Sequence, residues 1–293
     1  MEIKVAKTAG FCFGVSRAME LVEHLSKKGE KVSTLGPIIH NPQAVSDLES
    51  QGVTVVNSLS ECENDRTVVI RSHGVPKSVY GEIESLGLKF ADATCPFVEK
   101  IHKIVQNASE NGNAILIAGD RNHPEVKGIM GFAKSDVFVF DSLDELEKIL
   151  KNNNYFQNVG LTAVSQTTFD LNLWKKCEKN IKKVCTNAKI FDTICDATSK
   201  RQNEAEKLSK ECDLMIVIGG RQSSNTAKLA SICRRNCKTL LCETADELDE
   251  SLLTSVAKIG ITAGASTPAV IIKDVLNRAS KIIDNVDNKE ELL

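Results

Sequence analysis

Residues 8–29, TAGFCFGVSRAMELVEHLSKKG, place Cys12 between two phenylalanines and two glycines, where a strand gives way to a helix. The residues before it alternate charged and apolar side chains like a strand, and those after it follow a helical period. In parallel α/β sheets, ligands bind beyond the carboxyl ends of the strands. A buried structural cysteine does not need this setting, so Cys12 is a candidate ligand-binding residue.

The same arrangement recurs at Cys95, in DATCP (92–96), and at Cys195, in TICDAT (193–198). A glycine follows each of the three cysteines by 24 residues, at Gly36, Gly119 and Gly219. Each glycine loop is followed by a second polar loop at a strand end, namely IRSHGVP (70–76), AVSQTT (163–168) and ITAGASTP (261–268). The recurrence predicts three similar units.

Short apolar strands alternate with amphipathic helices, which is typical of parallel sheets covered on both faces. The strands are expected at 67–72, 113–120, 158–165, 213–220 and 256–264, and helices at 96–112 and 199–211. In the first two units, the strand after the second loop ends at a cysteine, Cys95 or Cys195. The third unit has no such cysteine, and Cys12 has no unit before it. The N-terminal strand is therefore predicted to complete the third unit.

The predicted fold is therefore an α/β trefoil of three Rossmann-like units around a pseudo-threefold axis. The predicted boundaries are 14–95, 96–195 and 196–283 completed by 1–13, with a polar tail at 284–293. A plain pair of Rossmann domains is the alternative.

The composition indicates a globular protein, with 42% hydrophobic residues and a net charge of −2. Neither sign of charge clusters, which argues against nucleic acid or an anionic membrane as a partner. No apolar run approaches the roughly 18 residues that span a bilayer, and the N-terminus lacks a signal-peptide core. These features predict a cytoplasmic protein without a membrane partner, whose ten cysteines stay reduced. The cysteines are then inert thiols, ligands of a metal or iron–sulfur site, or redox catalysts.

Three thiolates meeting on one axis would suit a metal centre with an open position. A structural zinc site takes four ligands, and a cubane iron–sulfur cluster usually takes four cysteines. A cluster held by three leaves one iron open as a Lewis acid. The other seven cysteines are interpreted as small hydrophobic or surface residues: Cys62, Cys177, Cys185, Cys212, Cys233, Cys237 and Cys242.

Polar residues in the strand-end loops suit a phosphate ligand. Three of the five histidines lie in these loops, and the other two, His24 and His102, lie in helices as ordinary packing residues. Hydroxyl and amide side chains also precede predicted helices, where backbone N–H groups bind phosphate, although helix capping is the simpler alternative. A P-loop and a G-x-G-x-x-G fingerprint are both lacking, which argues against a nucleotide. The candidates are His40, His73, His123, Ser223, Ser224, Asn225 and Ser266.

Glu125 follows a His-Pro pair at a predicted helix start. The simplest role for its carboxyl group is to complement the helix dipole, and the catalytic alternative is that of a general acid. Thr167, in SQTT, could hold this carboxyl group or a substrate hydroxyl.

Nine motifs occur in order between residue 9 and about residue 268: AGFCFGV, HNP, SHGV, DATCP, HPEVKGIMG, SQTT, ICDAT with RQ, SSNT and TAGASTP. Together they resemble the family of 4-hydroxy-3-methylbut-2-enyl diphosphate reductases, which act last in the non-mevalonate isoprenoid pathway. The resemblance implies one oxygen-sensitive 4Fe–4S cluster bound by Cys12, Cys95 and Cys195. It also implies a diphosphate bound by the seven loop candidates, and a proton relay that begins at Glu125 with Thr167 beside it.

The activity implied by this resemblance is reductive dehydroxylation of a small allylic diphosphate. Two electrons from an external donor such as ferredoxin or flavodoxin, with two protons, expel water and give isopentenyl and dimethylallyl diphosphates. A hydratase-type lyase with the same cluster is one rival, and it would need no electron donor. A non-catalytic phosphate-binding or metal-sensing module is the other.

Overall fold

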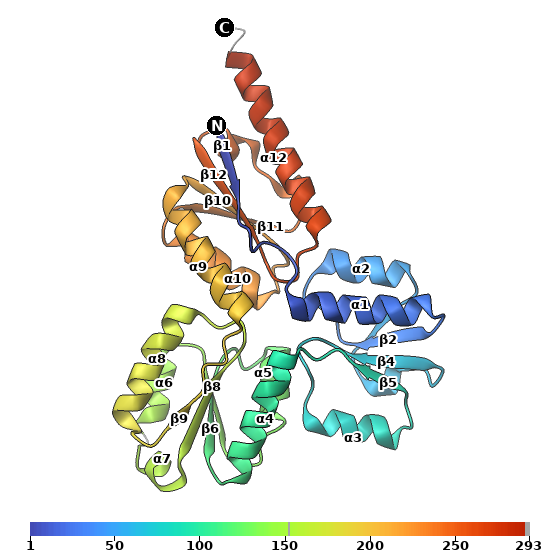
Figure 1. Ribbon diagram of the computed structural model, residues 1–293, viewed down its shortest axis with the longest axis vertical. Coiled ribbons are helices and arrows are strands. Elements are labelled where there is room, and N and C mark those ends of the chain that lie inside the picture. The colour runs from blue at the N-terminus through green and yellow to red at the C-terminus, as the bar shows by residue number, and fades with distance from the viewer. Residues whose placement is uncertain (152, 291–293) are drawn as a thin grey trace. The chain divides into compact units, whose positions relative to one another are not determined.

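The computed structural model describes residues 1–151 and 153–290, in which strands and helices alternate along the chain (Figure 1). The chain forms two compact units. The terminal unit comprises Met1–Phe13, His40–Ala44 and Asp196–Leu293, and the central unit comprises Gly14–Ile39 and Val45–Cys195.

The central unit contains two parallel four-stranded sheets. The first has the order β3-β2-β4-β5 and the second has the order β7-β6-β8-β9. The first sheet's strands are β2 (Lys31–Leu35), β3 (Thr54–Val56), β4 (Arg66–Ile70) and β5 (Phe90–Asp92), and those of the second are β6 (Ala114–Ala118), β7 (Val137–Phe140), β8 (Leu161–Ser165) and β9 (Lys189–Ile190).

The helices around these sheets follow the expected alternation, and α4 and α5 begin with a proline, whose fixed φ suits the first helical turn. They are α1 (Phe13–Lys27), α2 (Pro42–Ser50), the 3₁₀ turn η1 (Leu59–Glu61), α3 (Lys77–Ser85), α4 (Pro96–Glu110), α5 (Pro124–Met130), α6 (Leu143–Leu150), α7 (Asn153–Val159) and α8 (Leu171–Val184).

The terminal unit contains a third parallel sheet, with the order β1-β12-β10-β11. Its strands are β1 (Glu2–Val5), β10 (Leu214–Ile218), β11 (Lys238–Cys242) and β12 (Lys258–Ala263). Its helical segments are α9 (Asp196–Glu211), α10 (Ser224–Arg234), η2 (Ala245–Glu247), α11 (Glu250–Leu253) and α12 (Ala269–Glu290).

All three sheets have the same topology, because β1 occupies the edge position that β5 and β9 occupy in the other two. The register places Glu2 opposite Lys258 and Val5 opposite Ile261, so the first strand of the chain pairs with the last (Figure 1). The predicted α/β class with three similar units is confirmed, and a plain pair of Rossmann domains is wrong. The division of the chain into three domains at residues 14, 96 and 196 stays a prediction.

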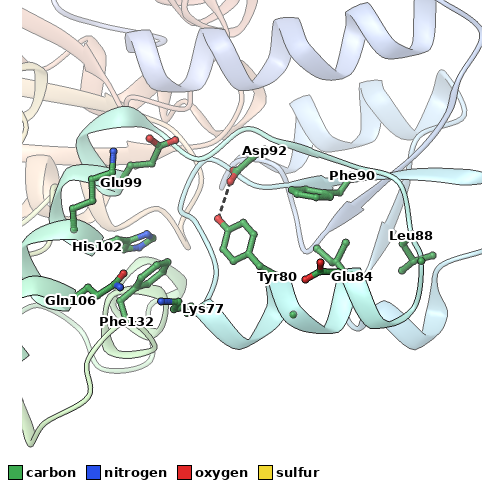
Figure 2. A pocket seen from close by; sticks show the side chains of 14 residues that line it. Lys77, Tyr80, Glu84, Leu88, Phe90, Asp92, Glu99, His102, Gln106 and Phe132 are labelled. Atoms are coloured by element: carbon green, nitrogen blue, oxygen red, sulfur yellow. Dashed lines mark hydrogen bonds between the residues drawn. The ribbon is translucent and has the colours of Figure 1, made fainter. Parts of the chain in front are cut away.

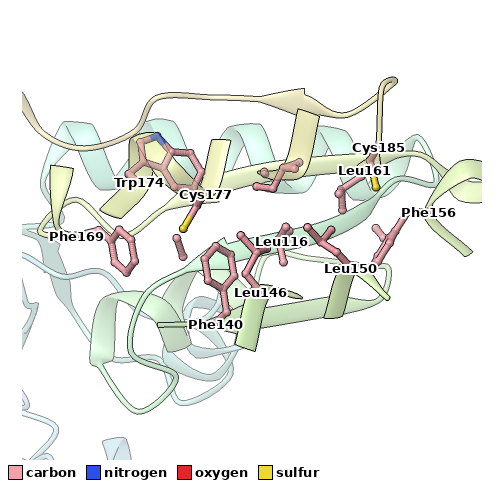
Figure 3. Packing of buried hydrophobic residues seen from close by; sticks show 14 of the residues in the cluster. Leu116, Phe140, Leu146, Leu150, Phe156, Leu161, Phe169, Trp174, Cys177 and Cys185 are labelled. Carbon is pink, nitrogen blue, oxygen red and sulfur yellow. The ribbon is translucent and has the colours of Figure 1, made fainter. Parts of the chain in front are cut away.

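The central strands form because their apolar, often β-branched residues are covered on both faces. Every residue of β6, β8 and β10 is buried, as expected of parallel sheets between helices. Figure 3 shows one core of the central unit, in which Leu146 and Leu150 of α6 and Trp174 and Cys177 of α8 pack together with Leu116 of β6. A rigid sheet of this kind fixes the loops at its carboxyl edge, where all the candidate residues lie.

The five predicted strands and two predicted helices are present, with ends shifted by a few residues. The polar tail at 284–293 stays a prediction; α12 continues to Glu290, and residues 291–293 lie outside the described residues. Buried Ile271, Val275, Ala279 and Ile282 anchor the helix at helical spacing. Once a helix is anchored, each added residue contributes one more hydrogen bond, so it extends into polar sequence.

Candidate active site

Each of the three candidate cysteines lies one residue before a helix: Cys12 before α1, Cys95 before α4 and Cys195 before α9. Each cysteine N–H donates to a carbonyl oxygen of the loop that follows the neighbouring strand. The N···O distances are 3.2 Å from Cys12 to Ala265, 3.0 Å from Cys95 to Ser72 and 3.1 Å from Cys195 to Thr167. The predicted placement at a strand end, just before a helix, is confirmed for all three, and their role as cluster ligands stays a prediction.

Gly14, on the first turn of α1, makes room for the Cys95 side chain. A Cβ atom at Gly14 would lie 2.6 Å from Sγ and 3.1 Å from Cβ of Cys95. The thiol of Cys95 thus lies directly against α1. Three half-buried thiols on loops, one of them seated against a glycine, fit the soft-ligand requirement of an iron–sulfur cluster.

We expect Gly14→Ala to lower the free energy of unfolding by about 1–3 kcal/mol and the melting temperature with it. Rotation of the thiol alone does not relieve the contact between the added Cβ atom and Cβ of Cys95. Differential scanning calorimetry measures the effect. Gly81→Ala is the matched control: Gly81 is also helical, and a Cβ atom added there would meet nothing within 4 Å, so that change should stabilise by up to about 1 kcal/mol. Equal melting temperatures for Gly14→Ala and wild type would contradict the close packing.

Glu125 and Thr167 form a buried pair in the central unit. Glu125 lies in the first turn of α5 with 2% of its surface exposed. The N–H of Thr167 donates to Oε1 of Glu125 at 2.6 Å, and Oγ1 of Thr167 donates to Oε2 at 2.8 Å. Burial raises the pKa of Glu125 to about 7, although the two hydrogen bonds from Thr167 oppose this shift. A carboxyl group with such a pKa can both hold and release a proton near neutral pH.

Thr167 also links this carboxyl group to a candidate cysteine. Its carbonyl oxygen accepts the N–H of Cys195, while its own N–H and hydroxyl hold Glu125. The expectation that Thr167 could hold the carboxyl of Glu125 is met. One residue therefore contacts both a buried acid and the loop of a predicted cluster ligand.

His123 caps α5, and its ring has a defined hydrogen-bonding direction. Nδ1 accepts the backbone N–H of Glu125 at 3.1 Å. A neutral imidazole that accepts at Nδ1 carries its proton on Nε2, so Nε2 is a donor. The ring of His73 meets it edge to face, with 5.3 Å between centroids. The structure thus brings two of the three candidate histidines together in the central unit.

The terminal unit holds the third candidate histidine together with Ser266. The hydroxyl of Ser266 donates to the backbone oxygen of His40 at 3.1 Å. Ser223 caps α10 by accepting the N–H of Thr226 at 3.3 Å, so the helix cap named as the simpler alternative is present at this serine. Ser224 is half-buried in the first turn of the same helix.

Capping does not account for Asn225. Its side chain is 4% exposed, and neither amide atom has a hydrogen-bond partner among the described residues. A buried amide without partners is costly, so Asn225 stays a candidate for contact with a polar ligand.

The remaining cysteines belong to the packing of the fold. Burial raises the pKa of the Cys177 thiol to about 11 and that of the Cys233 and Cys242 thiols to about 12. Such thiols stay protonated and unreactive at neutral pH. His102 is also a packing residue: its ring stacks on Phe132 at 4.1 Å, and burial lowers its pKa to about 4.

A separate cavity of about 1030 Å³ lies between α3 and α4 of the central unit. Figure 2 shows it beside the hydrogen bond from Tyr80 to Asp92, with Phe132 next to His102. None of the predicted site residues lines it, and its lysine and glutamate side chains favour no single ligand charge.

Two arginines that local sequence patterns do not single out hold the loops leading to the cysteines: Arg17 on α1 and Arg201 on α9. The motif RQ includes Arg201, but its role depends on residues almost 200 positions away.

Among the described residues, every helix is too short or too polar to cross a bilayer.

Comparison with known proteins agrees with this fold. The model of the LytB protein family matches residues 3–280. The 4-hydroxy-3-methylbut-2-enyl diphosphate reductase of Caldanaerobacter subterraneus subsp. tengcongensis is 43% identical over 99% of this chain and 100% of its own. The solved E-1-hydroxy-2-methyl-but-2-enyl-4-diphosphate reductase of Plasmodium falciparum matches with a TM-score of 0.88 and 31% identity, over 94% of this chain and 87% of that one. A solved (E)-4-hydroxy-3-methyl-but-2-enyl diphosphate reductase, the terminal enzyme of the non-mevalonate pathway, matches with a TM-score of 0.68 and 39% identity, over 96% and 100%.

The repeated parallel sheets, the buried acid and these relatives define an α/β enzyme of the oxidoreductase class. Within that class, the chain belongs to the LytB protein family.

Proposed function

We propose that the protein reductively dehydroxylates 4-hydroxy-3-methylbut-2-enyl diphosphate. The allylic C–O bond breaks, two electrons and two protons are consumed, and water leaves together with isopentenyl or dimethylallyl diphosphate. The names of the relatives that match nearly the whole chain support this reaction. Ferredoxin or flavodoxin in the cytoplasm is the proposed electron donor.

One 4Fe–4S cluster, bound by Cys12, Cys95 and Cys195, is the proposed cofactor. When bound, a cluster with three cysteine ligands supplies electrons and one open Lewis-acidic iron. The matching position of each cysteine, one residue before a helix and hydrogen-bonded to a strand-end loop, supports this ligand set. The predicted trefoil around a pseudo-threefold axis belongs to the same proposal.

The observation that carries the proposal is the double role of Thr167 beside Glu125 and Cys195. Hydroxide is a poor leaving group, so the reaction needs an acid near the substrate hydroxyl. Glu125, with a pKa of about 7, can deliver that proton at neutral pH. Burial of the pair excludes water from the acid.

The diphosphate is proposed to bind His40, His73, His123, Ser223, Ser224, Asn225 and Ser266. The unpartnered amide of Asn225 and the donor Nε2 of His123 support this role. The diphosphate then acts as an anchor remote from the reacting carbon, and its binding energy orients the allylic hydroxyl.

The test is to purify the protein without oxygen, measure iron and sulfide, and assay turnover of 4-hydroxy-3-methylbut-2-enyl diphosphate with a reduced ferredoxin. We expect about four irons per chain and both five-carbon diphosphate products. A colourless, iron-free protein would reject the cluster and favour a phosphate-binding module. Turnover that needs no reductant would reject the reductase and favour a lyase.

A further inference from the structure

Arg17 and Arg201 contact the main chain just before two of the candidate cysteines. Arg17 lies on α1, and its Nη1 donates to the carbonyl oxygen of Thr94, the residue before Cys95, at 2.9 Å. Its Nη2 makes a longer contact, 3.4 Å, with the carbonyl oxygen of Asp92. The guanidinium group thus holds two carbonyls of the loop that enters Cys95.

Arg201 on α9 does the same for the loop that enters Cys12. Its Nε donates to the carbonyl oxygen of Thr8 at 2.9 Å, and its Nη2 to that of Gly10 at 2.6 Å. The residue is 3% exposed. Because the planar guanidinium presents its donors at fixed angles, it restrains both carbonyls at once.

Glu204, one turn further along α9, forms additional hydrogen bonds to the loop that enters Cys12. Its carboxylate accepts the N–H of Lys7 at 2.8 Å, and the N–H and hydroxyl of Thr8 at 2.9 and 2.6 Å. Burial alone would raise the pKa of Glu204, but the hydrogen bonds from Thr8 and Lys7 outweigh it and leave the pKa below its ordinary value. The carboxylate therefore stays ionised and binds this loop at neutral pH.

The backbone conformation at Gly10 also restricts the loop before Cys12. Gly10 has a φ of +101°, and a Cβ atom there would lie 3.2 Å from Cδ1 of Ile272. A loop restrained at Thr8, Gly10 and the N–H of Cys12 has little freedom left to move the cysteine.

We propose that Arg17 and Arg201 are positioning residues, each of which holds the loop that enters one cluster cysteine: Arg17 for Cys95 and Arg201 for Cys12. This inference rests on the proposed function only in calling the cysteines cluster ligands. It assigns Arg17 to the cysteine that is distant in sequence, and not to Cys12, which lies five residues before it.

The test compares Arg17→Ala and Arg201→Ala in the full-length, metal-free protein. The rate at which iodoacetamide alkylates each cysteine is measured by peptide mass spectrometry. Arg17→Ala should speed alkylation of Cys95, and Arg201→Ala that of Cys12, by about 5- to 30-fold, while the other cysteine of the pair stays near its wild-type rate. Arg→Lys at each position should give a smaller increase, because one ammonium group cannot bind both carbonyls in the same way. If an alanine variant fails to fold, the lysine variant carries the test.

Lys27→Ala on α1 and Lys200→Ala on α9 are the matched controls, since both lysines form exposed ion pairs. Wild-type alkylation rates in the arginine variants would overturn the inference, as would an equal increase at both cysteines, which indicates general loosening. In the reconstituted variants, loss of the cluster absorbance in air should be faster than in wild type, and an unchanged rate would also overturn it. Wild-type protein that binds no iron would instead reject the proposed cluster and leave the alkylation test valid.

Discussion

Glu125→Gln should lower kcat by about 10²- to 10⁴-fold, while the iron content and the affinity for the diphosphate substrate stay near wild type. Glutamine has almost the same shape and can still accept the N–H of Thr167, but it has no proton to give. The loss should therefore fall on the chemical step. Steady-state kinetics under anaerobic conditions, together with iron analysis, separate these quantities.

The matched control is Glu145→Gln, because Glu145 also lies in the first turn of a helix but is exposed to solvent. Its kcat should equal that of wild type. Near-normal turnover in Glu125→Gln would remove Glu125 from the acid role.

The same residue should govern the pH dependence. With a pKa of about 7, Glu125 loses its proton as the pH rises through neutrality, so kcat should fall above about pH 7 in wild type, and the residual rate of Glu125→Gln should lack this fall. The folded state also binds this proton more tightly than the unfolded state, whose carboxyl has a pKa near 4.5. Its contribution to stability is therefore lost as the pH rises from about 4.5 to 7, and Glu125→Gln should gain in melting temperature over wild type more at pH 8 than at pH 5.

Cys195→Ser should abolish the cluster, lowering iron from about four per chain to near zero and removing the brown colour and the turnover. A serine hydroxyl is a hard, protonated group at neutral pH and a poor ligand for iron in a sulfide cluster. Iron and sulfide analysis of protein purified without oxygen measures the loss.

Cys237→Ser is the control for this second change. Cys237 lies between α10 and β11, half-buried, and burial raises the pKa of its thiol. The variant should keep the colour and the activity of wild type. Full iron content in Cys195→Ser would show that the cluster uses other ligands.

Much of this fold could be predicted from local sequence patterns. The runs around 113–120 and 213–220 consist of apolar, β-branched residues between turns, and they form the buried strands β6 and β10. The position of Cys95 before a helix follows from the proline beside it, which favours the first helical turn. The extent of α12 is harder to predict, because it depends on how firmly its apolar face is anchored in the folded unit.

Local sequence patterns predict the three repeated α/β units and the identity of the loop residues, since periodicity and turn chemistry are properties of neighbouring residues. The hydrogen bonds and the pKa shifts of these residues arise in the folded structure. Thr167 holds Glu125 across 42 positions, Arg17 reaches Thr94 across 77, and Arg201 reaches Thr8 across 193. A pKa shift comes from loss of water, and a guanidinium finds its carbonyl acceptors only where folding brings them together, so neither can be inferred from local sequence.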